Sequence, residues 1–187
     1  MTSINNERPE QAASVLADNH AELNKLIVDL LVTLEEGDKA RAFERLDLLW
    51  ARLAVHIRAE HLCLFPSILN APRAKFTARS GGPEYQEARS TINHLRLDHD
   101  FFMHELGTAI TTIRPHANVS DHEATSKQLR YVQSSIVKIQ SRLEQHNQLE
   151  ENHVYKWVNV LLGEAERLAL TARIRHELVK LPPRFKV

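Results

Sequence analysis

The chain of 187 residues has one cysteine, few glycines and prolines, and no excess of charge of either sign. A lone Cys63 excludes an internal disulfide framework and a paired-cysteine metal site, and favours a reducing cytoplasm. The 24 basic and 24 acidic residues balance without a basic stripe, so we expect neither nucleic acid nor a membrane surface as a partner. The longest apolar run, LIVDLLVTL (26–34), is short and interrupted by Asp29, and the polar N-terminus does not resemble a signal peptide. We therefore expect a single-domain cytoplasmic protein.

Most glycines and prolines fall between long segments with helical periodicity, and no segment alternates with the period of a strand. The expected helices cover about 9–36, 38–70, 83–114, 120–162 and 164–178. Long helices with short connections predict an all-α protein: an antiparallel up-down four-helix bundle with a short C-terminal extra helix. The chain then divides into an N-terminal tail (1–9), the bundle (10–162) and a C-terminal helix and tail (163–187).

Particular residues set the expected helix ends. Pro9 can open the first helix, Gly37 suits the left-handed residue after it, and Asp38 can cap the second helix. Ser120 and Glu123 have the spacing of a capping box for the fourth helix. The last residues, PPRFKV, read as a frayed tail.

Each of the four long helices carries one histidine within its apolar stripe. These histidines are His20, His56, His99 and His146. Two of the stripes also carry a glutamate one turn after the histidine, namely Glu60 and Glu150. The six polar side chains are therefore expected inside the bundle.

The distance of each histidine from the ends of its helix shows independently whether the four can lie at one level of the bundle. His20 lies about 16 residues before the end of its helix and His56 about 18 after the start of the next, so the two are roughly level. His99 matches His56 by the same reasoning, but His146 lies about 25 residues into the fourth helix. Either the fourth helix overhangs the bundle or the third continues past Pro115.

Four imidazoles and two carboxylates at one level of an apolar core point to a metal site. Buried polar groups without partners each cost about 1–3 kcal/mol, and a cation would remove that cost. Imidazole suits iron, copper, zinc or nickel, and a carboxylate can bridge two ions. Histidine and glutamate four residues apart stand on one helix face, so one helix can supply two ligands. Six protein ligands do not saturate two octahedral ions, which leaves positions for water, an oxo or hydroxo bridge, or a small ligand.

Other roles are open to several of these residues. A buried histidine is often only hydrogen-bonded, and a histidine–glutamate pair across one turn can be an ordinary hydrogen bond. On the third helix either His94 or His99 could be the ligand, because the two lie about 140° apart around the helix and cannot easily bind together. His99 is favoured, since it lies in the apolar stripe and at the level of the other histidines. His153 is expected to face the core one turn beyond Glu150, as an additional ligand or a group supporting one.

The remaining histidines and the cysteine need no role in such a site. Cys63 is expected to pack as a small apolar residue. Five histidines are expected to face solvent: His61, His104, His116, His122 and His176.

Four motifs together resemble the hemerythrin-like family, also called HHE cation-binding domains. They are DNHAELN around His20, HIRAEHLCLFP from His56, LDHDFFMHEL around His99 and HNQLEENHVYKW from His146. The resemblance covers about residues 10–170. It implies a four-helix bundle with a non-haem di-iron centre, oxo- or hydroxo-bridged, in which the glutamates are bridging ligands. Carried over by position, the ligands are His20, His56, Glu60, His99, His146 and Glu150; other divalent metals are possible.

The chain departs from two kinds of family member. Oxygen-carrying hemerythrins use five histidines, a glutamate and an aspartate, whereas this sequence is similar to a branch with two glutamates. Members that repair iron centres carry a small cysteine-bearing N-terminal domain, whereas about a dozen residues without cysteine precede the first helix here, so a repair role is not expected. A ferritin-like site would need Glu-x-x-His on two helices, and within the expected ligand set that pattern occurs once, at Glu150–His153.

The resemblance implies three possible functions. The first is binding of O2, NO or H2O2 at an open iron position, in oxygen or redox sensing or stress protection. An apolar wall one turn from the ligands is then expected from Leu23, Leu53, Phe102 and Leu143. The second is an enzyme that disproportionates peroxide or reduces NO, although no catalytic residue outside the ligand set is evident. The third is an iron-handling protein or sensor acting through an unknown protein partner on the C-terminal helix, which could equally pack back on its own bundle.

Overall fold

The computed structural model describes residues 11–77, 81–114 and 122–185. Its long helices are α1 (Ala12–Glu35), α2 (Lys39–Ala59), α4 (Tyr85–Ile113), α5 (His122–Leu149) and α7 (Glu164–Leu178). Its shorter elements are η1 (Glu60–Leu64), α3 (Phe65–Leu69), η2 (Arg73–Lys75), η4 (Glu150–Val154), α6 (Tyr155–Leu161) and η5 (Pro183–Phe185). In this part of the chain every regular element is a helix, so the all-α prediction is confirmed.

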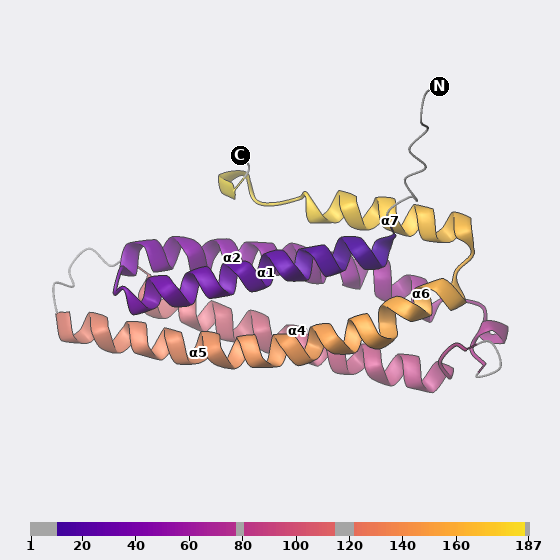
Figure 1. Ribbon diagram of the computed structural model, residues 1–187, viewed down its shortest axis with the longest axis horizontal. Coiled ribbons are helices and arrows are strands. Elements are labelled where there is room, and N and C mark those ends of the chain that lie inside the picture. The colour runs from indigo at the N-terminus through magenta and orange to yellow at the C-terminus, as the bar shows by residue number, and fades with distance from the viewer. Residues whose placement is uncertain (1–10, 78–80, 115–121, 186–187) are drawn as a thin grey trace, which may run out of the picture.

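Helices α1, α2, α4 and α5 form the predicted antiparallel bundle (Figure 1). They pack as a closed ring in which α1 contacts α2, α2 contacts α4, α4 contacts α5, and α5 contacts α1. Each helix carries an apolar stripe at steps of three and four residues, and the ring turns all four stripes inward. No described helix is both long enough and apolar enough to cross a membrane.

Local sequence signals explain where the first helices end and begin. Gly37 has a φ of +79°, the left-handed conformation that favours glycine after a helix. The side chain of Asp38 accepts a hydrogen bond of 3.0 Å from the backbone N–H of Arg41, as an N-cap does. The expected roles of Pro9 and Ser120 fall outside the described residues.

The depth of His146 has a simple explanation. Helix α4 ends at Ile113 and therefore does not continue past Pro115. Helix α5 is 28 residues long, and its N-terminal end projects beyond the neighbouring helices (Figure 1). The fourth helix therefore overhangs the bundle, which brings His146 level with the other three histidines.

The second and fourth expected helices are each interrupted by one π-helical turn. The turn η1 begins at Glu60, and the backbone N–H of Phe65 donates to the Glu60 carbonyl. The turn η4 begins at Glu150, and the N–H of Tyr155 donates to the Glu150 carbonyl. Such wide turns are rare and are often found at functional sites. Both lie where the sequence places a glutamate after a core histidine.

Helix α7 packs back on its own bundle. It contacts α1 and α2, and it buries Leu170 and Ile174. Pro66, which has no N–H, cannot donate to the Leu62 carbonyl four residues earlier, and Arg173 of α7 donates to that carbonyl at 2.8 Å. The proline that follows the first His-Glu pair thus frees the acceptor that helps to dock α7.

The prediction of a frayed tail is wrong for residues 182–185, which follow the buried Leu181. Leu181 is buried and, with Phe185, packs against Ala51 and Val55 of α2. The guanidinium of Arg184 pairs with a carboxylate of α2, that of Asp47, at 2.8 Å and 3.0 Å. These contacts order the segment despite its two prolines.

Inside the bundle, the two larger apolar clusters have a polar layer between them. One cluster includes Leu16 and Leu95, on one side of the core histidines. The other includes Leu23 and Phe102, on the opposite side. Because His20 lies between Leu16 and Leu23 along α1, and His99 between Leu95 and Phe102 along α4, the histidines form the layer that separates the clusters.

The cluster that contains Leu23 and Phe102 also includes residues farther from the polar layer, which should stabilise the fold without contributing to the site. Leu46 is fully buried there, and we expect Leu46→Ala to lower the free energy of unfolding by about 3 kcal/mol. Leu97→Ala is the matched control, because Leu97 is 63% exposed and its truncation should cost less than about 0.5 kcal/mol. Urea denaturation measures both, and equal losses in the two variants would contradict the assigned core.

Candidate metal centre

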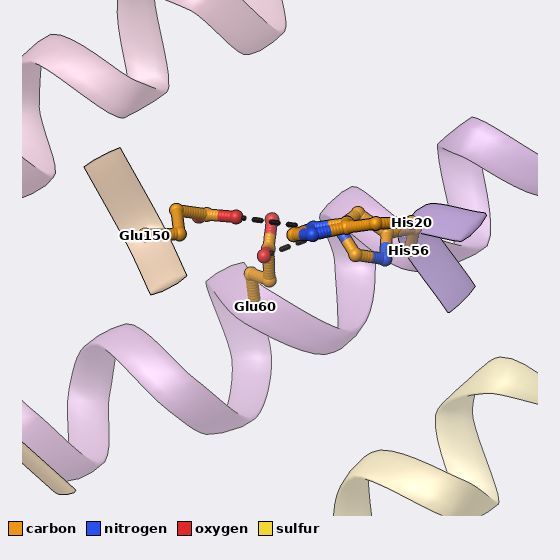
Figure 2. A group of neighbouring side chains, drawn as sticks. All are labelled: His20, His56, Glu60 and Glu150. Atoms are coloured by element: carbon orange, nitrogen blue, oxygen red, sulfur yellow. Dashed lines mark hydrogen bonds and ion pairs between the residues drawn. The ribbon is translucent and has the colours of Figure 1, made fainter. Parts of the chain in front are cut away.

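The six polar residues of the core stripes come together in the middle of the bundle. Their side chains form two groups that share both glutamates: His20, His56, Glu60 and Glu150, and Glu60, His99, His146 and Glu150. Within each group the possible ligand atoms all lie within 4.8 Å of one another. Figure 2 shows the first group, with the side chains pointing toward one another from different helices. All six are at most 2% exposed.

The histidines face each other in two pairs through their Nε2 atoms. The Nε2 atoms of His20 and His56 are 3.2 Å apart. Those of His99 and His146 are 3.1 Å apart. One pair comes from α1 and α2, and the other from α4 and α5, so each half of the bundle contributes one pair.

Each glutamate lies between the two pairs. The Glu60 carboxylate is 3.2 Å from His56 Nε2 through one oxygen and 3.2 Å from His99 Nε2 through the other. The Glu150 carboxylate is 3.3 Å from His20 Nε2 and 3.6 Å from His146 Nε2 in the same manner. Each carboxylate therefore reaches both histidine pairs, as a ligand bridging two ions would.

A partner behind three of the histidines fixes the protonation of the ring. His20 Nδ1 lies 2.9 Å from a carboxylate oxygen of Glu151, and His146 Nδ1 lies 3.2 Å from one of Asp98. His56 Nδ1 lies 2.8 Å from the amide oxygen of Asn19. These oxygens accept, so each Nδ1 carries a proton, and the Nε2 presents its lone pair inward when the ring is neutral.

The fourth histidine is supported by another histidine. His99 Nδ1 lies 2.9 Å from His61 Nε2, and the two rings are 5.0 Å apart. The pKa of His61 lies below its usual value, because of burial and the charge of His99. A neutral His61 can accept the Nδ1 proton of His99, which leaves the inner nitrogen of His99 free as well.

The carboxylates at the centre of the cluster lack hydrogen-bond partners for most of their oxygens. Both carboxylate oxygens of Glu60 and one of Glu150 are buried and make no hydrogen bond. The nearby imidazole nitrogens approach the Glu60 oxygens without the geometry of a hydrogen bond, so proximity alone does not satisfy them. Imidazole nitrogens and carboxylate oxygens that converge in this way fit metal cations.

Without a cation, protons must occupy the site. Burial alone would lower the pKa of His20, but Glu150, Glu151 and Glu60 together hold it above the usual value. The pKa of His146 is raised in the same way against burial, mainly by the hydrogen bond with Asp98. Burial would raise the pKa of Glu60, but its histidine neighbours hold it well below the usual range. Metal ions and protons would thus compete for the same atoms.

Two of the alternative ligands lie outside the cluster. The side chain of His94 is 63% exposed and lies 3.8 Å from Asp98, whereas His99 is buried in the second group. His153, expected to face the core, is exposed and stacks edge-on with Trp157. The reason is the π turn η4, which turns Tyr155, five residues after Glu150, toward the site in its place.

Of the histidines expected to face solvent, one has a different position. His61 is half-buried behind His99, so the prediction that it faces solvent is wrong. His104 and His176 are exposed, as expected, while the side chains of His116 and His122 are not described. Cys63 is 3% exposed, and burial raises the pKa of its thiol, in agreement with an apolar packing role.

Sequence reasoning also missed the residues behind the ligands and the tyrosine. They are Asn19, Asp98, Glu151 and Tyr155. Their signal lies in position: Asn19 and Asp98 each precede a core histidine, and His61 and Glu151 each follow a core glutamate. A metal-binding histidine generally donates its outer N–H to an acceptor, so the polar residues next to each motif are candidate acceptors.

Asp98 is held by more than its histidine. Arg142 lies 2.7 Å from one of its carboxylate oxygens, while His146 lies against the other. The pKa of Asp98 is lowered, because these hydrogen bonds outweigh the effect of burial. The carboxylate therefore stays ionised and keeps the outer proton of His146 in place.

The comparisons with known proteins agree with this geometry. Residues 11–158 match the family model described as the hemerythrin HHE cation binding domain. No curated protein and no solved structure matched the chain. The matched residues contain all six side chains of the cluster. The chain belongs to the hemerythrin HHE cation-binding family.

Proposed function

We propose that the protein is a non-haem di-iron protein that binds a small diatomic or peroxide ligand, O2, NO or H2O2, in oxygen or redox sensing or stress protection. The observation that carries the proposal is the uncompensated set of buried ligand atoms. Four Nε2 atoms and two carboxylates converge at one level of the core, and three of the carboxylate oxygens have no hydrogen-bond partner. Such a set is costly unless cations complete it.

The residues divide into two similar halves, each of which would hold one iron ion. His20 and His56 would hold one ion, His99 and His146 the other, and the two glutamates would bridge them. The ions would supply redox chemistry and an open coordination position. Asn19, Glu151, Asp98 and His61 keep the four rings in the tautomer that coordinates.

The surroundings support a small ligand. Leu23, Leu53, Phe102 and Leu143 are at most 2% exposed, and the Phe102 ring lies edge-on to His146 at 5.4 Å. These apolar side chains shield the cluster from bulk water on this side, which favours a small ligand. We infer a reducing cytoplasmic location, since Cys63 is the only cysteine.

Metal binding should stabilise the protein more strongly as the pH rises. The raised pKa values of His20 and His146 mean that protonation stabilises the metal-free protein below about pH 6.5, and that this contribution is lost as the pH rises through the raised values. A cation needs the same nitrogens without protons, so its apparent affinity should increase by up to about tenfold per pH unit for each displaced proton.

The measurement is the gain in Tm on adding ferrous iron without oxygen, at about pH 6 and about pH 8. We expect the larger gain at the higher pH, and the same trend in His94→Ala, whose side chain is largely exposed. A gain that is equal at the two pH values, or larger at the lower one, would contradict binding through these histidines.

Ligand binding should give an optical signal that depends on the cluster. Protein loaded anaerobically with ferrous iron should develop new visible absorption with O2, NO or H2O2, and His94→Ala should do the same. The His56→Ala, His146→Ala double variant should not respond, because it loses one nitrogen ligand from each ion. Full iron content with no response to any of the three would sink the proposed function. Sustained gas evolution from peroxide would replace it with the enzymatic alternative.

A further inference from the structure

The two halves of the centre are related by a sequence repeat that differs at one functional atom. Asn19–His20 corresponds to Asp98–His99, and the segment 56–65 corresponds to 146–155. In both segments a histidine is followed by a glutamate four residues later, and a π turn ends at an aromatic residue nine positions after the histidine. That residue is Phe65 in the first segment and Tyr155 in the second.

The two aromatic rings occupy equivalent places. Phe65 stacks on His99 with ring centroids 5.9 Å apart and an angle of 14°. Tyr155 stacks on His20 with centroids 5.9 Å apart and an angle of 24°. Phe65, which follows α2, thus contacts His99 on α4, and Tyr155, which follows α5, contacts His20 on α1. Each ring therefore reaches from one half of the bundle to a histidine of the other half. The difference between them is the hydroxyl of Tyr155.

That hydroxyl points at atoms of the first ligand group. The Tyr155 oxygen is 3.1 Å from His20 Nε2 and 3.2 Å from a carboxylate oxygen of Glu150. The same two atoms of His20 and Glu150 are 3.3 Å apart. Two ligand atoms about 2.1 Å from one ion and at right angles are about 3.0 Å apart, so the three atoms have the spacing of neighbouring ligands.

We propose that the Tyr155 oxygen is a further ligand of the ion held by His20 and His56, and that the exogenous ligand binds the other ion. This rests on the proposed di-iron function and deepens it. The first ion would have five protein donors, whereas the ion at His99 and His146 would have four, because Phe65 offers none. The open position is therefore on the second ion, beside the apolar rings of Phe65 and Phe102.

Coordination replaces one bond by another without a change of oxidation state. The O–H bond of the phenol breaks, an iron–oxygen bond forms, and the proton leaves to solvent. Tyr155 is 4% exposed and its hydroxyl already contacts two atoms of the ligand set, so no side-chain rearrangement across the core is needed.

The test uses the full chain loaded with ferrous iron without oxygen and oxidised with ferricyanide. A phenolate bound to ferric iron gives a visible charge-transfer band and tyrosinate vibrations in resonance Raman spectra. We expect both in the wild-type protein and neither in Tyr155→Phe, with two irons per chain retained in each. Phe65→Tyr is the matched variant, since it places a hydroxyl on the second ion, and it should strengthen the band and weaken azide binding.

The outcomes separate this proposal from the function on which it rests. Two irons in wild type and Tyr155→Phe, with identical visible and Raman spectra, would overturn the tyrosine ligand and leave the di-iron centre intact. The Phe65→Tyr variant tests where the open position lies. If its new hydroxyl adds tyrosinate vibrations but azide binds as tightly as in the wild-type protein, the open position is not on the second ion and that part of the proposal is overturned. A wild-type protein that holds no iron would overturn both proposals.

Discussion

The structure depends on the convergence of four imidazole nitrogens and two carboxylates in one buried layer of the core. An apolar bundle of this size could be built without these groups, and each one buried without a partner works against folding. The cost is limited only if something positively charged occupies the centre, whether protons or metal ions. The raised pKa values of His20 and His146 show how the metal-free protein holds protons there.

The rest of the bundle serves the geometry of that layer. The overhang of α5 brings His146 level with the histidines of the other helices. The π turns at Glu60 and Glu150 bring a residue five positions later back to the site. Acceptors such as Asp98, itself held by Arg142, fix the ring protons from behind. Each feature is local, and together they orient six side chains from four helices.

The sequence predicted the bundle and the cluster because both follow from helical periodicity. Histidines at steps of three or four from buried leucines must face the core, and counting residues along each helix placed them at one level. Periodicity assumes a regular α-helix, however, so it could not anticipate the π turns. For that reason His153 was placed inside and Tyr155 was overlooked. His61 was misjudged because its role depends on a contact with another helix, the one that carries His99.

The most direct test of the account is the metal content of the protein after anaerobic loading with ferrous iron and removal of free metal. Under the proposed di-iron function, elemental analysis should find two irons per chain in the wild-type protein, one for each ligand group, and the His56→Ala, His146→Ala double variant should lose most of them. No tightly held metal in a folded wild-type protein would contradict the central claim. The cluster would then be a set of buried groups that hold protons and hydrogen-bond with one another.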